Sequence, residues 1–268
     1  MLKRWLQRGL ARYSFELRRR PALLEGVLPV GRDAFIDQAR LFSAVDAAVI
    51  FDVGAHHGHI TGKYLELFPH AVVHAFEPFP ESYAVMRERF AGATSVVLVD
   101  KAVAASDGCA EFFVNRAEYT NSLLASDHEA TPWVPSSTTE NLARIEVCTC
   151  TLDSYCVDNN IERIDILKTD IQGAEILALR GARRLLAEKR IDILFLEVLF
   201  APLYAGQSDF CEILAFLSHT GYHLVGIYNQ MHGNNGLAGW ADAVFVSEDF
   251  SMPSMFRENH QLTSGPCG

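Results

Sequence analysis

The sequence predicts an α/β protein with a doubly wound, mostly parallel sheet, and three observations lead to this prediction. Five short apolar runs recur along the chain: "AVIFDV", "AVVHAFE", "SVVLVDKAV", "IDILKTD" and "IDILFLEV". Continuous apolar runs of this length are typical of parallel strands buried on both faces. Helix-length segments follow the first, second, fourth and fifth runs, at His59 to Phe68, Pro80 to Phe90, Gly173 to Lys189 and Gln207 to His219. The 268 residues, 49% of them hydrophobic, suffice for one large domain with its own core.

Two regions depart from the strand–helix alternation. Gly108 to Val114 and Ile145 to Leu152 have the pattern of extra strands, and the polar segment between them is about two dozen residues long. A loop of that length in a compact domain is a lid, a binding loop or a disordered segment. Near the end, "YHLVGIY" and "ADAVFVS" flank a Gly/Asn-rich link without room for a crossover helix. We therefore expect these two strands to form an antiparallel pair that closes one edge of the sheet.

Charge and composition divide the chain into a basic, partly helical extension (1–40), a main domain (41–250) and a polar tail (251–268). Seven basic residues and one acidic residue give the first twenty residues a net charge of +6, although the whole chain carries -10. The negative total argues against nucleic acid as the main partner, because phosphate binding needs a basic surface. We expect the basic extension to be a solvated helix, with contact to a membrane surface or an acidic partner as the alternative.

The chain shows no signal-peptide pattern and no apolar stretch long enough to span a bilayer, so we expect a cytoplasmic protein. Its six cysteines include no CxxC pair, and reduced structural thiols are the default expectation in that compartment.

A glycine turn follows the first strand in "FDVGAHHGHIT". It contains Gly54 and Gly58 but matches neither the dinucleotide fingerprint GxGxxG nor a P-loop. Asp52, just before the turn, would repel a pyrophosphate and attract a cation. Glu77 ends the second strand, where a carboxylate can accept hydrogen bonds from both ribose hydroxyls. Together these features predict a ligand with a ribose, a positive centre and no phosphate, which describes S-adenosylmethionine.

Histidines in the same turn raise the alternative of a metal site. His56, His57 and His59 are the candidate ligands. However, neighbouring residues on a tight turn point in different directions, and no Cys/His cluster lies at a recognisable ligand spacing. We therefore assign no metal to the turn.

Four segments, "FDVGAHHGHIT", "AFEPFPESY", "LKTDIQGAEILALRGA" and "ADAVFV", together resemble the FkbM-type methyltransferases over roughly Val49 to Val246. The resemblance implies a Rossmann-like class I methyltransferase fold: a mostly parallel seven-stranded sheet with an antiparallel last strand. It also implies S-adenosylmethionine as cofactor and O-methylation of a hydroxyl on a sugar, glycan, polyketide or related metabolite. His56 is a departure, since members usually carry Asn there. The residues expected to bind the cofactor lie in the glycine turn and after the second and third strands: Asp52, Gly54, Ala55, His56, Gly58, Glu77, Pro78, Asp100 and Ala102.

Acceptor chemistry is expected at the carboxyl ends of the fourth and fifth strands. Methyl transfer to an alcohol needs alignment and removal of a proton. Asp170 is the first candidate for general base or positioning residue, and Glu197 is the second. Alternatively, Asp170 caps the following helix, Glu175 stabilises its first turn, and Lys168 pairs with either acid. Oxygen ligands suit magnesium, so a divalent ion held by Asp170 and Glu197 also stays open.

Further candidates for a small-molecule or glycan acceptor pocket come from the long loop and the late part of the chain: Tyr119, Asn121, Ser122, Tyr204, His232 and Trp240. Two other functions compete with methyl transfer. A nicotinamide-dependent oxidoreductase uses the same kind of sheet, but the missing GxGxxG argues against it. A non-catalytic cofactor-binding module would not need the acids Asp52, Glu77 and Asp170.

Overall fold

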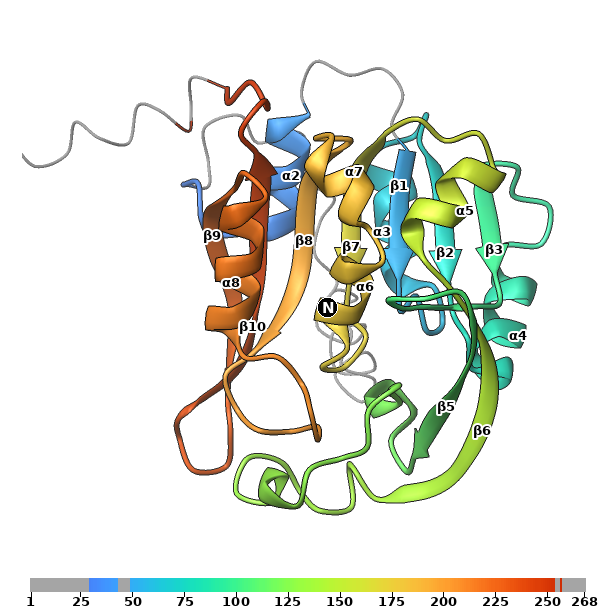
Figure 1. Ribbon diagram of the computed structural model, residues 1–268, viewed down its shortest axis with the longest axis vertical. Helices are drawn as coiled ribbons and strands as arrows, with labels where there is room; N and C mark the ends of the chain where they lie inside the picture. The colour runs from blue at the N-terminus through green and yellow to red at the C-terminus, as the bar shows by residue number, and fades with distance from the viewer. Residues whose placement is uncertain (1–28, 43–48, 254–255, 257–268) are drawn as a thin grey trace, which may run out of the picture.

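Seven strands form the main sheet of the computed structural model, which describes residues 29–42, 49–253 and 256 (Figure 1). Their order across the sheet is β3-β2-β1-β7-β8-β10-β9. The first five are parallel, whereas β10 runs antiparallel to both of its neighbours. The predicted doubly wound fold with an antiparallel closing strand is confirmed. The strands are β1 (Val49–Val53), β2 (Val72–Phe76), β3 (Val96–Val99), β7 (Ile164–Thr169), β8 (Ile191–Leu199), β9 (Tyr222–His232) and β10 (Ala238–Ser247).

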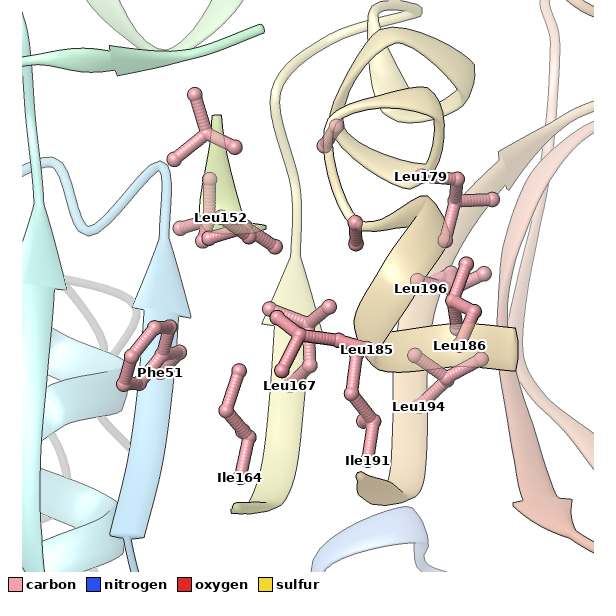
Figure 2. Close-up of a cluster of buried hydrophobic side chains, with 14 of the residues drawn as sticks. Phe51, Leu152, Ile164, Leu167, Leu179, Leu185, Leu186, Ile191, Leu194 and Leu196 are labelled. Atoms are coloured by element: carbon pink, nitrogen blue, oxygen red, sulfur yellow. The ribbon is translucent and has the colours of Figure 1, made fainter. Parts of the chain in front are cut away.

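Helices cover both faces of this sheet because alternate strand residues point to opposite faces. Ile50 and Ile166 belong to the cluster that packs on α2 and α3, and Met86 of α4 packs on Ala75 of β2. Phe51 and Leu167 belong to the opposite cluster, which is shared with α5 to α8 (Figure 2). The helices are α2 (Ala34–Leu41), α3 (His59–Leu67), α4 (Pro80–Arg89), α5 (Leu152–Asp158), α6 (Glu175–Arg180), α7 (Arg183–Ala187) and α8 (Phe210–His219).

The segment predicted as one helix over Gly173 to Lys189 is two helices, α6 and α7. Gly181 lies between them, and a Cβ there would overlap the carbonyl oxygen of Ala104. The Asp153 carboxylate accepts hydrogen bonds from the backbone N–H groups of Arg184 and Leu185, at 2.9 and 3.0 Å. It therefore caps a new helix at this point.

Two strand predictions also had wrong ends. "SVVLVDKAV" is split between β3 of the main sheet and β4 (Ala102–Val103) of a second sheet. The run predicted to continue to Leu152 ends at Cys150, because the Thr151 side chain accepts from the Ser154 backbone N–H and starts α5. Sequence reasoning missed that helix.

The second sheet has the order β4-β6-β5, with β5 spanning Gly108–Asn115 and β6 spanning Asn141–Cys150. The two predicted extra strands are thus confirmed as an antiparallel arm, which carries the long loop (116–140) at its far end (Figure 1). The loop contains the 3-10 helices η2 (Glu118–Thr120) and η3 (His128–Ala130). It is fastened to the β8–α8 connection, since Asp127 N donates to Leu203 O and Ala205 N to Ala125 O, each at 2.8 Å.

Residues 1–28 of the predicted basic, partly helical extension (1–40) lie outside the described residues, as do 254–255 and 257–268 of the predicted tail (251–268). Within the described ranges, no helix has the length and apolar character needed to cross a membrane.

Candidate functional site

A cavity of about 210 Å³ opens at the carboxyl ends of β1, β2 and β7. We call it the central cavity. Seven of the eleven predicted site residues line it: Gly54, Ala55, His56, Glu77, Pro78, Ala102 and Asp170. The other four, Asp52, Gly58, Asp100 and Glu197, are not among its lining residues. The cavity therefore unites the turn after β1, the end of β2 and the end of β7, which are far apart in the sequence.

The glycine turn forms one wall, and its two glycines serve different purposes. Gly54 has φ +76°, and a Cβ there would overlap the carbonyl oxygen of Asp170. Gly58 has φ +73°, and a Cβ there would overlap the Phe90 ring beside α4. Gly54 thus lets the ends of β1 and β7 approach each other. Gly58 instead permits packing of α3 against α4 and does not reach the cavity.

Glu77 fixes this turn from the end of β2. Its Oε2 accepts from the His56 backbone N–H at 2.7 Å, and its Oε1 accepts from the Phe79 N–H at 2.9 Å. Burial raises the pKa of Glu77 to about 7, although these two hydrogen bonds and Lys168 act to lower it. The carboxylate is thus held rigidly in the cavity wall with lone pairs left for a ligand.

Asp52 lies behind the wall, with 0% of its surface exposed. Its Oδ2 accepts from the Thr61 hydroxyl at 2.6 Å, and its Oδ1 lies 3.0 Å from the Lys168 ammonium. Lys168 also donates to the Gly54 carbonyl at 3.0 Å, and it does line the cavity. Burial acts to lower the pKa of Lys168, but Asp52 and Asp170 outweigh it and raise the pKa. Asp52 therefore does not contact the cavity directly, but it pairs with Lys168, which does line it.

Apolar side chains and one unsatisfied amide complete the central cavity. Phe112 comes from β5, and Asn121 and Leu123 come from the long loop. The Asn121 Oδ1 accepts from the Asn115 N–H at 2.7 Å, whereas its buried Nδ2 has no partner among the residues that the structure describes. A buried donor without a partner is costly, so it suits a ligand that brings an acceptor. Of the acceptor candidates, Tyr119 and Asn121 line this cavity, whereas His232 and Trp240 do not.

Gln172 organises the acids at the ends of β7 and β8. Its Nε2 donates to Asp170 Oδ1 and to Glu197 Oε2, each at 2.9 Å. Its Oε1 accepts from the Tyr204 hydroxyl at 2.8 Å. Its backbone carbonyl oxygen accepts from the Ser122 hydroxyl, also at 2.8 Å. Its backbone adopts φ +57°, a conformation that a residue other than glycine rarely takes. Sequence reasoning missed Gln172, since no local pattern shows that it joins two strand ends.

The two acids joined by Gln172 differ in environment. Burial raises the pKa of Glu197 well above its ordinary value, and Asp170, Glu175 and Asp242 raise it further. These surroundings therefore favour the protonated form of Glu197 more than those of an exposed carboxyl would. The side chain of Asp170 is 43% exposed. Asp170 does not cap the next helix, because Ala174 is the N-cap residue of α6.

The methyltransferase FkbM domain matches residues 52–224 of the chain. The chain belongs to the FkbM methyltransferase family. Its fold is accordingly that of an S-adenosylmethionine-dependent methyltransferase. The 2-O-methyltransferase NoeI of Sinorhizobium fredii is 27% identical to it over 182 residues, which are 63% of this chain and 70% of NoeI.

Solved structures of other methyltransferases are similar to the present chain, at low sequence identity. An rRNA methylase from Streptococcus thermophilus is 11% identical with a TM-score of 0.45, over 80% of this chain and 93% of that one. A precorrin-6y C5,15-methyltransferase from Geobacter metallireducens is 12% identical with a TM-score of 0.42, over 80% and 87% of the two chains.

In this FkbM methyltransferase, two histidines of the turn contact the long loop. His57 Nε2 and His56 Nε2 lie 3.4 and 3.7 Å from the same oxygen of Glu118. The two rings are stacked, with centroids 3.8 Å apart and planes 19° apart. An imidazole lone pair lies in the ring plane, so two nearly parallel rings do not aim at one metal ion. His56, His57 and Glu118 are therefore better described as a contact between the glycine turn and η2. The third histidine of the turn, His59, lies beside Arg89 instead.

The acids of the methyltransferase do not fit a bridging magnesium ion as they are arranged. The Gln172 amide nitrogen lies within hydrogen-bond distance of both Asp170 and Glu197, so a donor already occupies the position between them. Burial raises the pKa of Glu197, which disfavours the ionised carboxylate that a hard cation needs. We therefore derive no step through a metal at this position.

Proposed function

We propose that this FkbM methyltransferase transfers a methyl group from S-adenosylmethionine to a hydroxyl group of a small-molecule or glycan acceptor. The observation that supports this most directly is the Asp170 carboxylate, which lies at the edge of the central cavity and is held by the Gln172 amide. The similarity to a relative whose name specifies 2-O-methyl transfer supports oxygen as the methyl acceptor.

The central cavity has the groups that S-adenosylmethionine needs. Glu77 offers a carboxylate to the ribose hydroxyls, and the unpartnered Asn121 Nδ2 offers a donor. Phe112 and Leu123 supply apolar walls for a flat base. When bound, the cofactor supplies a methyl group already activated by its sulfonium. The protein's contribution is to orient that group and to exclude water.

Asp170 acts as the general base in this proposal. Its Oδ1 is engaged by Gln172, which leaves Oδ2 to accept the proton of the acceptor hydroxyl. Lys168 Nζ lies 3.9 Å from Oδ2. Glu197 does not line the central cavity and accepts from the Gln172 amide, so we assign it a hydrogen-bonding role and not that of a second base. A positioned base commonly accelerates a reaction about 10²–10⁴-fold.

Gln172 and Tyr204 are positioning residues for that base. The Gln172 amide has both of its polar atoms engaged, so it cannot rotate without losing contacts to two acids and a tyrosine. Tyr204 is buried, and its hydroxyl oxygen also lies 3.2 Å from the Thr120 carbonyl oxygen. The long loop and the strand ends are thereby held in one arrangement around Asp170.

The proposal is tested in two steps. Calorimetry with S-adenosylmethionine, S-adenosylhomocysteine and NAD in parallel should show binding of the first two only. The enzyme is then incubated with isotopically labelled S-adenosylmethionine and a panel of sugars, glycans and polyketide alcohols, and products are located by mass spectrometry and NMR. Label on an acceptor oxygen supports the proposal. Label found only on nitrogen or carbon, or binding of NAD instead, would overturn it.

A further inference from the structure

We propose that Cys109 and Cys148 form a thiol pair that closes reversibly into a disulfide on reaction with an oxidised low-molecular-weight disulfide. The two cysteines face each other directly across the antiparallel pair of β5 and β6. Both side chains are exposed. Residues directly opposite in an antiparallel pair point to the same face, so the two thiols lie side by side on one surface of the arm.

Opposite residues in an antiparallel ladder form either a hydrogen-bonded pair or a non-hydrogen-bonded pair, and the second kind has the shorter Cα–Cα distance. The backbone hydrogen bonds show that Cys109 and Cys148 are of the second kind. Phe113 exchanges both of its backbone hydrogen bonds with Ser122, on the side of β5 away from β6. Cys109 is four residues earlier on the same strand, before the irregularity at Val114, so its backbone groups also face away from β6. Cys109 and Cys148 are therefore a non-hydrogen-bonded pair.

The other strand leads to the same conclusion. Ala104 N donates to Cys150 O at 3.0 Å, so the Cys150 carbonyl faces β4, and that of Cys148, two residues earlier, does too. In non-hydrogen-bonded pairs the Cα atoms are about 4.5 Å apart. Disulfides span Cα separations of about 4.4–6.8 Å. The pair can thus be bridged without moving the backbone far.

The other cysteines of the described chain are differently placed. Burial raises the pKa of Cys150 to about 11 and that of Cys156 to about 12, which makes both poor nucleophiles. Cys211 is exposed on the helix α8, so it has no cross-strand partner. Cys148 lines a surface cavity of about 330 Å³ together with Arg87, Asp100 and Glu146, so a small reagent can approach it.

Closure proceeds in two exchange steps. One cysteine thiolate attacks a sulfur of the reagent and displaces one reagent thiolate, which leaves a mixed disulfide. The second cysteine attacks the protein sulfur of that mixed disulfide and displaces the other reagent thiolate. In total, the protein loses two protons and two electrons, and the reagent is reduced to two thiols. Partial desolvation, Cys148 and Glu146 raise the pKa of Cys109, so exchange should accelerate as the pH rises towards 9.

The bridge would tie together the two ends of the arm that helps to form the central cavity. Phe112, Tyr119, Asn121 and Leu123 all lie between the two cysteines in sequence and line that cavity. A disulfide restricts the unfolded chain over the enclosed segment 110–147 and so favours the folded arm. The oxidation state of the pair thus bears on the stability of the arm that carries these lining residues.

The test incubates the full-length protein at pH 8.5 in glutathione buffers of graded oxidation, blocks the remaining thiols and maps peptides by mass spectrometry. We expect a Cys109–Cys148 cross-linked peptide, formed at a rate independent of protein concentration and reversed by reductant. The oxidised protein should melt roughly 5–10 °C above the reduced protein.

Cys109→Ser should abolish the cross-link and the rise in Tm, and leave a glutathione adduct on Cys148. Cys148→Ser should give the mirror result, and Cys211→Ser should change neither the cross-link nor the Tm shift. The proposal is overturned if the parent gives only glutathione adducts at Cys109 and Cys148 across the whole series. It is overturned equally if the cross-link joins two chains or other cysteines.

Discussion

The Lys168 ammonium and the Asp52 carboxylate form a buried ion pair, 3.0 Å apart, directly behind the turn that lines the central cavity. The two residues are register partners on the adjacent parallel strands β1 and β7. Lys168 also donates to the carbonyls of Val53 and Gly54, at 3.3 and 3.0 Å. The pair therefore fastens the strand ends from which the cofactor turn and the proposed base extend.

Lys168→Met should strongly destabilise the protein, because it leaves the Asp52 carboxylate buried without a counter-charge. Loss of one partner of a buried pair typically costs about 3–5 kcal/mol. Urea denaturation measures the change. The double variant Asp52→Asn with Lys168→Met should recover much of the loss, since neither charge is then stranded.

The matched control is the exposed pair of Arg180 and Glu212, whose side chains are 42% and 51% exposed. Arg180→Met should cost about 0–1 kcal/mol. Equal losses at the two pairs would show that burial of Lys168 and Asp52 has no energetic consequence. Asp52→Asn should also weaken cofactor binding less than the change at Glu77 described next, because Asp52 does not line the cavity.

Glu77→Gln should weaken S-adenosylmethionine binding about ten-fold or more, since loss of a charged hydrogen-bond partner costs about 1.5–3 kcal/mol. Burial raises the pKa of Glu77 to about 7, so the parent should bind more tightly as pH rises through 7 and the carboxyl ionises. The variant should lack that pH dependence. Calorimetry at several pH values measures both effects, and a folded variant that binds like the parent at every pH would refute the ribose assignment.

Asp170→Asn and Glu197→Gln should differ sharply in their effect on turnover. The first removes the proposed base and should lower the single-turnover rate by about 10²–10⁴-fold while cofactor affinity is kept. The second changes a residue that does not line the central cavity and keeps the shape of its side chain, so its effect should be within about ten-fold. Rapid-quench measurements with an acceptor that the parent enzyme methylates compare the two. The reverse ranking would make Glu197 the base.

Stability should fall as pH rises from about 4.5 to about 7, in part because of Glu175. Glu175 is 2% exposed, and burial raises its pKa from 4.5 to about 7. Between these values the folded protein holds a proton that the unfolded chain has lost, so raising the pH favours unfolding. Glu175→Gln should flatten this dependence by about 1–3 kcal/mol. Urea denaturation at pH 5, 6, 7 and 8 measures the slope, and parallel slopes for variant and parent would contradict the assignment.

The sequence alone was enough to predict the architecture and the position of the glycine turn. Buried parallel strands are continuous apolar runs, and this pattern can be read from neighbouring residues. The carboxyl ends of parallel strands meet at one edge of the sheet. The sequence therefore predicted that Gly54, Glu77 and Asp170 lie near one another. The closing antiparallel pair followed from the shortness of its link.

Helix boundaries and contacts across the site could not be predicted in this way. The division of α6 from α7 depends on the close approach of Gly181 to the Ala104 carbonyl, a contact between distant segments. The position of Asp52 depends on its pairing with Lys168 across two strands. Likewise, Gln172 meets Glu197 only because β7 and β8 pair in a particular register.

The chain by itself thus determined the strands of the main sheet and the edge of that sheet at which the central cavity opens, because apolar periodicity and glycine turns are local properties. Only the tertiary structure decided which acid faces the cavity, which is shielded from solvent and which is held by a neighbour. Burial and hydrogen bonding set those properties, and both depend on residues that are distant in sequence. That is why Glu77 and Asp170 line the cavity. Asp52 and Glu197 carry the same carboxyl groups but do not line it.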